Sequence, residues 1–164
     1  MIVTIDGVAG AGKTTLALDM NEEYRNHFSI QVIHMDDLYN GWNDPFGTTL
    51  LQKLKEIAAA HLAKSPYETT IYNWRSAGPG DAFLIEPVDM LIIEGVGSGH
   101  RSIRKYVATK IWIDLDPLLG LERVLAREGV NIESQMRTFL EDQKIHFDKD
   151  GTRDAADFHL NGLR

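Results

Sequence analysis

The sequence predicts an α/β fold of three layers, in which a parallel sheet carries helices on both faces. Stretches rich in β-branched residues alternate with helix-like stretches along the 164 residues. A glycine-rich turn joins the first β-prone stretch, residues 2–5, to a helix-like stretch that starts at Lys13. A near-continuous apolar run, residues 88–93, is typical of a central parallel strand that is buried on both faces. Repeated β-α-β units of this kind build a parallel sheet.

The glycine-rich turn, residues 7–14, reads Gly-Val-Ala-Gly-Ala-Gly-Lys-Thr and fits the P-loop, or Walker A, pattern G-x-x-x-x-G-K-[ST]. The strand before it and the helix after it are the context that the motif needs. Glycines let the loop wrap closely, so its backbone N–H groups and the helix N-terminus face an anion. The alternative is a glycine-rich turn that binds nothing, but the flanking pattern disfavours it. The sequence therefore predicts the fold of P-loop NTPases.

The motif assigns chemistry to its residues. Lys13 is expected to reach the β- and γ-phosphates of a nucleotide, and the Thr14 hydroxyl is expected to bind Mg²⁺. The residues predicted to bind the nucleotide are Gly7, Ala9, Gly10, Ala11, Gly12, Lys13, Thr14 and Thr15.

Composition sets limits on the class of protein. The length suits one domain, and the absence of cysteine excludes disulfides and thiolate metal sites. A net charge of −7 argues against a general nucleic-acid-binding surface. No signal peptide and no apolar run of membrane-spanning length is recognisable. We expect a cytoplasmic protein without nucleic-acid or membrane partners, and the sequence does not predict its oligomeric state.

Acidic residues follow two predicted strands. Residues 30–35 read as a strand that ends at Asp36 and Asp37, and Glu94 ends the apolar strand. Ligands of open α/β sheets bind beyond the carboxyl ends of the strands, so these acids lie where a substrate would be met. Glu94 is expected beside the P-loop, where it can reach Mg²⁺ through water. The alternatives are that Asp36 or Asp37 caps a turn and that Glu94 is an ordinary strand-end carboxylate.

The middle of the chain offers candidates for an acceptor pocket. Residues 40–48 read as a loop, and Thr49 with Gln52 resembles a capping box. The predicted helix that follows has one apolar stripe (Leu50, Leu54, Ile57, Ala58, His61 and Leu62). Residues 69–72 are β-prone, and residues 76–81 read as a loop. Tyr72, Trp74 and Arg75 could line an acceptor pocket, although aromatic side chains also serve as core.

The last third of the chain predicts further helices and strands. Residues 102–108 are expected to be helical, and residues 110–115 and 155–160 to be strands. A helix is expected to start at Asp116-Pro117 and to bury Leu118, Leu121 and Leu125. Another is expected from Asn131 to about residue 148, which makes residues 117–150 a lid-like helical region of the single domain.

Two arginines lie on one face of the first of these helices. Arg123 and Arg127 are four residues apart, so they repel each other slightly unless an anion lies between them. The alternative is a plain surface helix in which Glu122 and Glu128 pair locally.

The chain resembles the uridine kinase-like branch of P-loop kinases in five segments. These are residues 6–16, 34–39, 72–74 and 92–95 and the arginine-bearing helix 121–128. The chain is similar to its short, bacterial-type members. The resemblance implies ATP and Mg²⁺ as cofactors. It implies that Asp36 orients and deprotonates the acceptor hydroxyl, and that Arg123 and Arg127 neutralise the transferred phosphoryl group. The metal-site candidates are Thr14, Asp36 and Glu94, and the substrate-site candidates are Asp37, Tyr39, Trp42, Tyr72, Trp74 and Arg75.

The chain also departs from that family. Its length leaves little expected room for the β-hairpin that embraces the nucleoside in uridine kinases. Asp37 stands where a small polar residue is expected, and Trp42 and Trp74 are unexpected in a pyrimidine pocket. These departures concern the identity of the acceptor more than the phosphoryl transfer.

The predicted function is ATP-dependent, Mg²⁺-requiring phosphoryl transfer to a small, hydroxyl-bearing, nucleoside-like acceptor. The predicted catalytic residues are Lys13, Asp36, Arg123 and Arg127. One alternative is a nucleoside monophosphate kinase, in which Arg75, Arg101 and Arg104 would bind the acceptor phosphate. The other is an ATP-binding switch without a small-molecule acceptor. A GTPase is disfavoured because the chain has no N-K-x-D motif.

Overall fold

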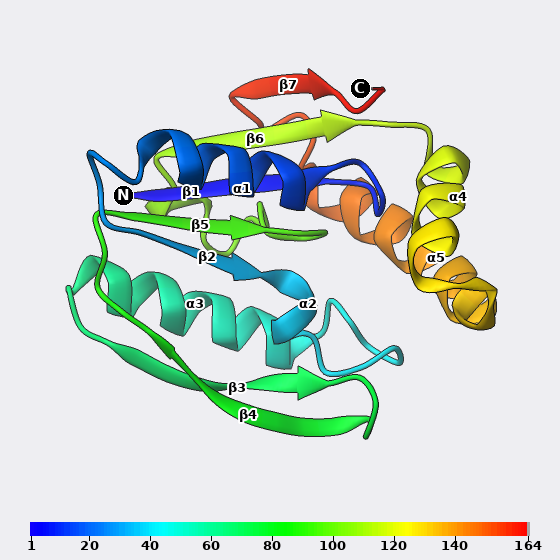
Figure 1. The fold of residues 1–164 in the computed structure, drawn as a ribbon, viewed down its shortest axis with the longest axis horizontal. Helices are drawn as coiled ribbons and strands as arrows, with labels where there is room; N and C mark the ends of the chain where they lie inside the picture. Colours follow the sequence, from blue (N-terminus) through cyan, green and yellow to red (C-terminus); the bar gives the residue numbers. More distant parts are fainter. Residues whose placement is uncertain (164) are drawn as a thin grey trace.

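A five-stranded parallel sheet organises the computed structural model, which describes residues 1–163 (Figure 1). The strand order is β2-β5-β1-β6-β7, and every neighbouring pair is parallel. The strands are β1 (Ile2–Gly7), β2 (Ile30–His34), β5 (Met90–Glu94), β6 (Thr109–Asp114) and β7 (Phe158–Asn161). This confirms the predicted parallel sheet, and it places the P-loop strand β1 at the centre.

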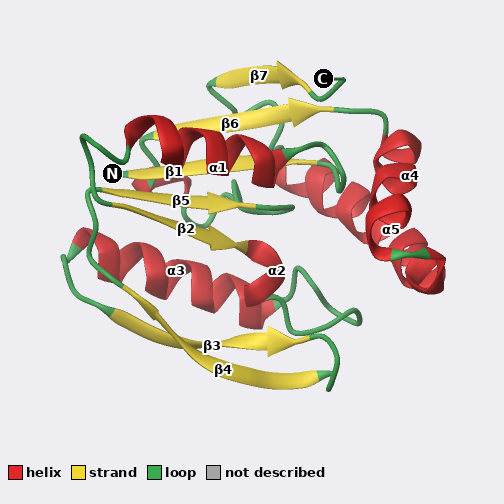
Figure 2. Ribbon diagram, in the orientation of Figure 1, coloured by secondary structure: helices red, strands yellow, loops and turns green. Residues whose placement is uncertain are grey.

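Helices cover both faces of the sheet, as predicted (Figure 2). Residues alternate between faces along each strand. Ile2 and Ile93 pack on one side with α3 (Thr48–Leu62) and α5 (Glu133–Asp150), whereas Val3, Ile5 and Ile92 pack on the other side with α1 (Lys13–Tyr24). The fold is therefore three-layered, with two apolar cores that flank the sheet.

Two helices lie beyond the carboxyl ends of the strands. The short α2 (Met35–Leu38) directly follows β2, and α4 (Pro117–Glu128) follows β6. The start of α4 is encoded locally. Pro117 occupies its first turn, and the Asp116 carboxylate accepts hydrogen bonds from the N–H groups of Leu118 and Leu119. Within residues 1–163, no helix combines the length and the apolar character needed to cross a bilayer.

A β-hairpin lies outside the main sheet. Strands β3 (Tyr67–Asn73) and β4 (Gly78–Ile85) pair antiparallel beside α3 and form a two-stranded sheet (Figure 1). The expectation that the chain has little room for such a hairpin is wrong. The loop expected at residues 76–81 is confirmed only for Ser76 and Ala77, which lie in the hairpin turn, because the rest of that stretch belongs to β4. The glycines and proline of that stretch read as a loop, but a strand with one free edge tolerates them.

Three local expectations also fail. Residues 102–108 form a 3-10 turn at Arg104–Tyr106 rather than a helix. The capping box at Thr49 does not form, because α3 starts at Thr48 after Gly47, and the Gln52 amide instead bonds to Glu56. Leu118 is 63% exposed because the first turn of α4 projects beyond the edge of the core.

Candidate active site

A cavity of about 740 Å³ opens at the carboxyl ends of β1, β5 and β2. The P-loop and α4 form one side of the cavity, and α2, the loop after it and the hairpin turn form the opposite side. The predicted site residues that line it are Ala9, Gly10, Gly12, Lys13, Thr14, Thr15, Asp36, Asp37, Tyr39, Trp42, Trp74, Glu94, Arg123 and Arg127. The fold thus brings most of the candidates, which are distributed over 119 residues of sequence, to one cavity.

The P-loop wraps around the buried Lys13 side chain. Its ammonium group donates hydrogen bonds to the carbonyl oxygens of Gly7, at 2.9 Å, and Val8, at 2.7 Å. Gly10 and Gly12 have φ values of +78° and +94°, which side chains with a Cβ rarely adopt. Burial lowers the pKa of Lys13, and the charges of Asp6, Glu94 and Asp36 oppose this shift. The Lys13 ammonium group is therefore buried close to several carboxylates at the base of the cavity.

Asp6, to which the sequence assigned no role, fixes the P-loop to the loop after β5. Its Oδ1 accepts hydrogen bonds from the N–H groups of Gly7 and Gly97, and its Oδ2 accepts one from Gly99. The side chain is buried, and burial raises its pKa from 3.8 to about 6 although all three hydrogen bonds lower it. This carboxylate sets the spacing of the two loops that border the cavity.

Glu94 lies where a Mg²⁺ site is expected. The Thr14 hydroxyl donates to its Oε1 at 2.9 Å, and Nδ1 of His34, which pairs with Glu94 in the sheet register, lies 2.5 Å from the same oxygen. This hydrogen bond raises the pKa of His34. Glu94 also raises the pKa values of Asp36 and Asp37, so the acids crowd one another.

The donor set fits Mg²⁺. Hydroxyl and carboxylate oxygens are ligands that it accepts, and the crowded negative charge favours a cation. In the part of the chain that the structure describes, no three His, Asp or Glu side chains are grouped closely enough to hold a metal by themselves. Magnesium sites in phosphoryl-transfer proteins use one or two carboxylates with phosphates and water, which agrees with this geometry.

Helix α2 presents Asp36 and Asp37 to the cavity. The Asp36 side chain is open to the cavity but surrounded by protein on its other sides, and this desolvation raises its pKa despite the opposing charge of Lys13. The Trp74 indole N–H donates to the Asp36 carbonyl at 3.0 Å, which fixes the hairpin turn to α2. The two acids are not turn caps, because neither carboxylate accepts a backbone hydrogen bond within residues 1–163.

The aromatic candidates separate into two groups. Trp42 and Trp74 line the cavity with ring centroids 4.9 Å apart. Tyr39 contributes its ring, but its hydroxyl donates to the Val96 carbonyl at 2.7 Å. Tyr72 packs against Trp74 and does not line the cavity, and neither does Arg75, which lies exposed at the hairpin turn.

The two arginines of α4 occupy different places. Arg123 donates from Nη1 to the Gly162 carbonyl, at 2.7 Å, and more weakly to the Gly10 carbonyl, at 3.4 Å. Arg127 is exposed, pairs with Glu128, and lies near enough to Lys13 and Asp36 to affect their pKa values. Both arginines line the cavity, but their guanidinium groups bond differently, that of Arg127 to Glu128 and that of Arg123 to backbone carbonyl oxygens.

Comparison with known proteins places this site in context. No family model matches the chain. It is 25% identical over 155 residues to a uridine kinase of Latilactobacillus sakei, covering 85% of this chain and 70% of that protein. It is 26% identical over 141 residues to a cytidylate kinase of Methanococcoides burtonii, covering 86% and 71%. A solved structure described as a possible uridine kinase from Bacillus stearothermophilus superposes with a TM-score of 0.70 at 17% identity, covering 98% of this chain and 88% of the other.

The chain is a kinase that is similar to uridine kinases and has the fold of P-loop kinases. This confirms the resemblance and the enzyme class that the sequence predicts. The roles of the individual site residues stay predictions, which the geometry above makes testable.

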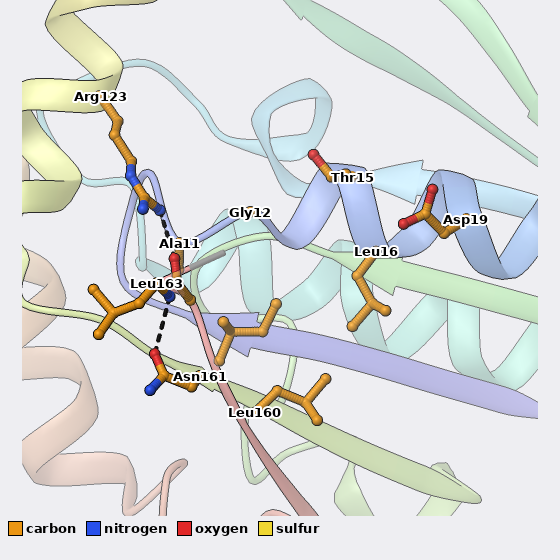
Figure 3. Close-up of a pocket in the computed structure, with 11 residues that line it drawn as sticks. Ala11, Gly12, Thr15, Leu16, Asp19, Arg123, Leu160, Asn161 and Leu163 are labelled. Carbon is orange, nitrogen blue, oxygen red and sulfur yellow. Dashed lines mark hydrogen bonds between the residues drawn. The ribbon is translucent and has the colours of Figure 1, made fainter.

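The kinase has a second cavity, of about 510 Å³, beside the P-loop (Figure 3). Arg123 lies between the two cavities and lines both. The walls of the second cavity are the start of α1, the end of β6 and the C-terminal residues 160–163. No local pattern in the sequence predicts the C-terminal contribution, because residues 160–163 reach the P-loop only through the pairing of β7 with β6.

The arginines considered for an acceptor phosphate are engaged elsewhere in the kinase. Arg101 and Arg104 both pair with the buried Asp150 at the end of α5. Neither lines the main cavity. Their pairing fixes the segment after the β5 loop to α5, which is a structural role.

Proposed function

We propose that this kinase transfers the γ-phosphoryl group of ATP to a hydroxyl group of a small, nucleoside-like acceptor, with Mg²⁺ as cofactor. One observation carries the proposal. A single cavity contains the P-loop residues Lys13 and Thr14, the strand-end acid Glu94, and Asp36 on the opposite wall. A nucleotide held by the P-loop would therefore direct its phosphates toward Asp36.

The nucleotide side has room for the base of ATP as well as for its phosphates. The second cavity adjoins the P-loop and is lined by leucine and isoleucine side chains, by the polar Thr15, Asp19 and Asn161, and by the Arg123 guanidinium (Figure 3). A flat base fits such a site, because guanidinium groups stack on aromatic rings. Mg²⁺ bound near Thr14 and Glu94 would neutralise charge on the β- and γ-phosphates.

Asp36 is proposed to orient the acceptor hydroxyl. In the transfer, the hydroxyl oxygen forms a bond to the γ-phosphorus while the bond from that phosphorus to the β–γ bridging oxygen breaks and ADP leaves. The hydroxyl proton passes to the Asp36 carboxylate. The raised pKa of Asp36 makes it a better proton acceptor than an ordinary aspartate.

The helical region 117–150 is proposed to act as a lid within one domain. Its α4 carries Arg127, which lines the same cavity as Lys13 and Asp36. Phosphoryl transfer passes through a loose transition state, so positioning and neutralisation of charge dominate the rate. Arg127 supplies a positive charge at that position.

A nucleoside monophosphate kinase is the second candidate, since the relatives include a cytidylate kinase. The engagement of Arg101 and Arg104 with Asp150 weighs against it. A switch without an acceptor is disfavoured because the cavity extends well beyond the P-loop to α2 and the hairpin.

The test is ADP release from Mg·ATP with nucleosides, nucleoside monophosphates, sugars and vitamins added one at a time. We expect strong stimulation by one hydroxyl-bearing class. Lys13→Ala should abolish turnover, and Asp36→Asn should keep ATP binding but reduce transfer by about 10²-fold or more. Asp44→Asn, in the exposed loop outside the cavity, is the matched control. Near-native transfer by Asp36→Asn would contradict its assignment.

A further inference from the structure

The acceptor side of the cavity has no basic side chain among the described residues. Its charged lining residues are Asp36 and Asp37, both on α2, and α5 contributes only the apolar Met136 and Phe139. The basic lining residues, Lys13, Arg123 and Arg127, all lie on the P-loop helix or on α4. An acceptor that carries a phosphate or carboxylate would therefore meet acids without a neutralising partner.

Asp37 is the acid without an assigned task. Glu94 is engaged by Thr14 and His34, and Asp36 faces the reacting hydroxyl in the proposed function. The Asp37 carboxylate is half-buried, and within residues 1–163 it forms no hydrogen bond and no ion pair. Desolvation raises its pKa, Glu94 adds to this shift, and the charge of His34 opposes it. A partly desolvated carboxylate without a bonded partner is less stable than a solvated one, and a cation beside it would stabilise its charge.

Two indole rings face the same space. Trp42 and Trp74 lie edge to face, with centroids 4.9 Å apart and an interplanar angle of 61°. Trp42 also packs edge to face on Phe139, which holds its ring in place. The hydrogen bond from Trp74 to the Asp36 carbonyl fixes the other ring next to α2. Indole faces carry partial negative charge and attract cations, and a ring such as that of Trp74, which is 37% exposed, retains part of this attraction.

From this juxtaposition we propose that the acceptor carries a positive charge on a flat ring, which lies against Trp42 and Trp74 beside Asp37 while its hydroxyl reaches Asp36. A nucleoside with a cationic base has this chemistry. The inference rests on the proposed function and names the acceptor class for the same site. It also explains the two departures from the family pattern, because both the additional acid and the tryptophans favour a cation.

A matched pair of acceptors isolates the charge. Cytidine and 3-methylcytidine share the sugar and its hydroxyls, but methylation at N3 makes the ring cationic at neutral pH. Adenosine and 1-methyladenosine repeat the comparison on a larger ring, and cytidine 5′-monophosphate supplies an anionic acceptor. The measured quantity is kcat/KM from ADP release with Mg·ATP, for each member of each pair.

In at least one pair, we expect kcat/KM for the cationic acceptor to be about tenfold higher than kcat/KM for the neutral acceptor. A partly desolvated cation–π contact with a nearby carboxylate has an effect of this size. Asp37→Asn should bring this ratio close to one. Asp81→Asn, which removes the same charge from the exposed face of β4 outside the cavity, should leave the ratio unchanged. Trp74→Leu provides a second variant, which should also reduce the ratio. A merely structural role of either residue would lower both members of a pair equally.

The outcomes separate this inference from the proposed function. Phosphorylation of neutral nucleosides at rates equal to or above those of both cationic partners would overturn the cationic acceptor and keep the kinase reaction. Preferred phosphorylation of cytidine 5′-monophosphate would also overturn it. No stimulation of ADP release by any acceptor in the panel, with intact ATP binding, would count against the proposed function itself.

Discussion

The side-chain oxygen of Gln143, on α5, accepts a hydrogen bond from the backbone N–H of Ala9 in the P-loop, at 3.1 Å. Gln143 is 1% exposed, and the two residues are 134 positions apart in the chain. The bond ties the helical region over the cavity directly to the loop that is proposed to hold the nucleotide. A buried N–H group needs such a partner, so the conformation of the P-loop depends on the position of α5.

Removing this bond is expected to loosen the P-loop. Gln143→Met keeps the approximate volume of the side chain but leaves the Ala9 N–H unsatisfied, which costs about 1–3 kcal/mol. We expect a lower free energy of unfolding in urea and a raised KM for ATP, with a smaller change in KM for the acceptor. Gln135→Met, on the exposed face of α5, is the control and should change neither quantity. An unaltered KM for ATP in Gln143→Met would show that the bond only stabilises the fold.

Asp6 predicts a pH dependence of stability. Its pKa in the folded state, about 6, lies above the 3.8 of an unperturbed aspartate, so the folded protein holds this proton more tightly than the unfolded chain does. The contribution of Asp6 to stability therefore falls as the pH rises from about 4 to 6, by up to roughly 3 kcal/mol, and is constant above that range. This loss of stability is the free-energy cost of burying the charged Asp6 carboxylate, which sets the spacing of two loops.

The comparison that isolates this effect is wild type against Asp6→Asn. The difference in their free energies of unfolding, measured in urea between pH 4 and pH 7.5, should shift against the wild type as the pH rises and level off above pH 6. The variant also loses one acceptor, because an amide nitrogen cannot accept from Gly99, and this adds a pH-independent loss. Asp81→Asn, at an exposed position, should show no such trend. A pH-independent difference for Asp6→Asn would refute the raised pKa.

The sequence predicts those parts of the fold that local patterns encode. The apolar runs of β1 and β5 predict buried strands, and the helix start at Asp116 and Pro117 is encoded by neighbouring residues. The hairpin was missed because Gly78 and Pro79 are typical of loops, and their place in a strand depends on pairing with β3. Leu118 was misassigned for a related reason, since its periodicity cannot show that the core ends before the first turn of α4.

The candidate site shows the same division. Lys13, Thr14, Asp36 and Glu94 were identifiable because a motif or a strand end marks each of them, and all four line the cavity. The contact of Gln143 with Ala9 and the contribution of residues 160–163 have no local signal, because they join segments that are distant in sequence. Tyr72 lies in β3, and Trp74 and Arg75 lie in the turn after it, but only Trp74 lines the cavity, a difference that depends on the turn of the hairpin.

Arg123 and Arg127 are predicted to affect different kinetic constants. Arg123 lies between the two cavities and bonds to the Gly162 carbonyl, so Arg123→Ala should mainly raise the KM for ATP. Arg127 lines the main cavity with Lys13 and Asp36 but not the second cavity, so Arg127→Ala should mainly reduce kcat, by about 10²-fold for the loss of a charge that acts on the transferred group.

Steady-state kinetics with ATP and the acceptor varied separately distinguish the two effects. Arg137→Ala, which removes an exposed arginine of α5 that pairs with Glu133, is the control for the change in net charge. If Arg123→Ala reduces kcat as strongly as Arg127→Ala does, both arginines act on the phosphoryl group, as the resemblance to uridine kinase-like proteins implies.

Gly120 is where α4 touches the P-loop, and its substitution tests the lid most directly. A Cβ at Gly120 would lie 2.2 Å from the Ala9 carbonyl oxygen, so α4 and the loop must separate to admit it. Alanine ordinarily stabilises a helix by about 0.5–1 kcal/mol relative to glycine, but here the clash should reverse the sign and cost about 1–3 kcal/mol. Ala126→Gly, on the exposed face of α4, weakens the same helix without touching the loop. We therefore expect Gly120→Ala to raise the KM for ATP, whereas Ala126→Gly should lower only the free energy of unfolding. If both variants raise the KM for ATP equally, ATP binding depends on the stability of α4 rather than on its contact with the P-loop.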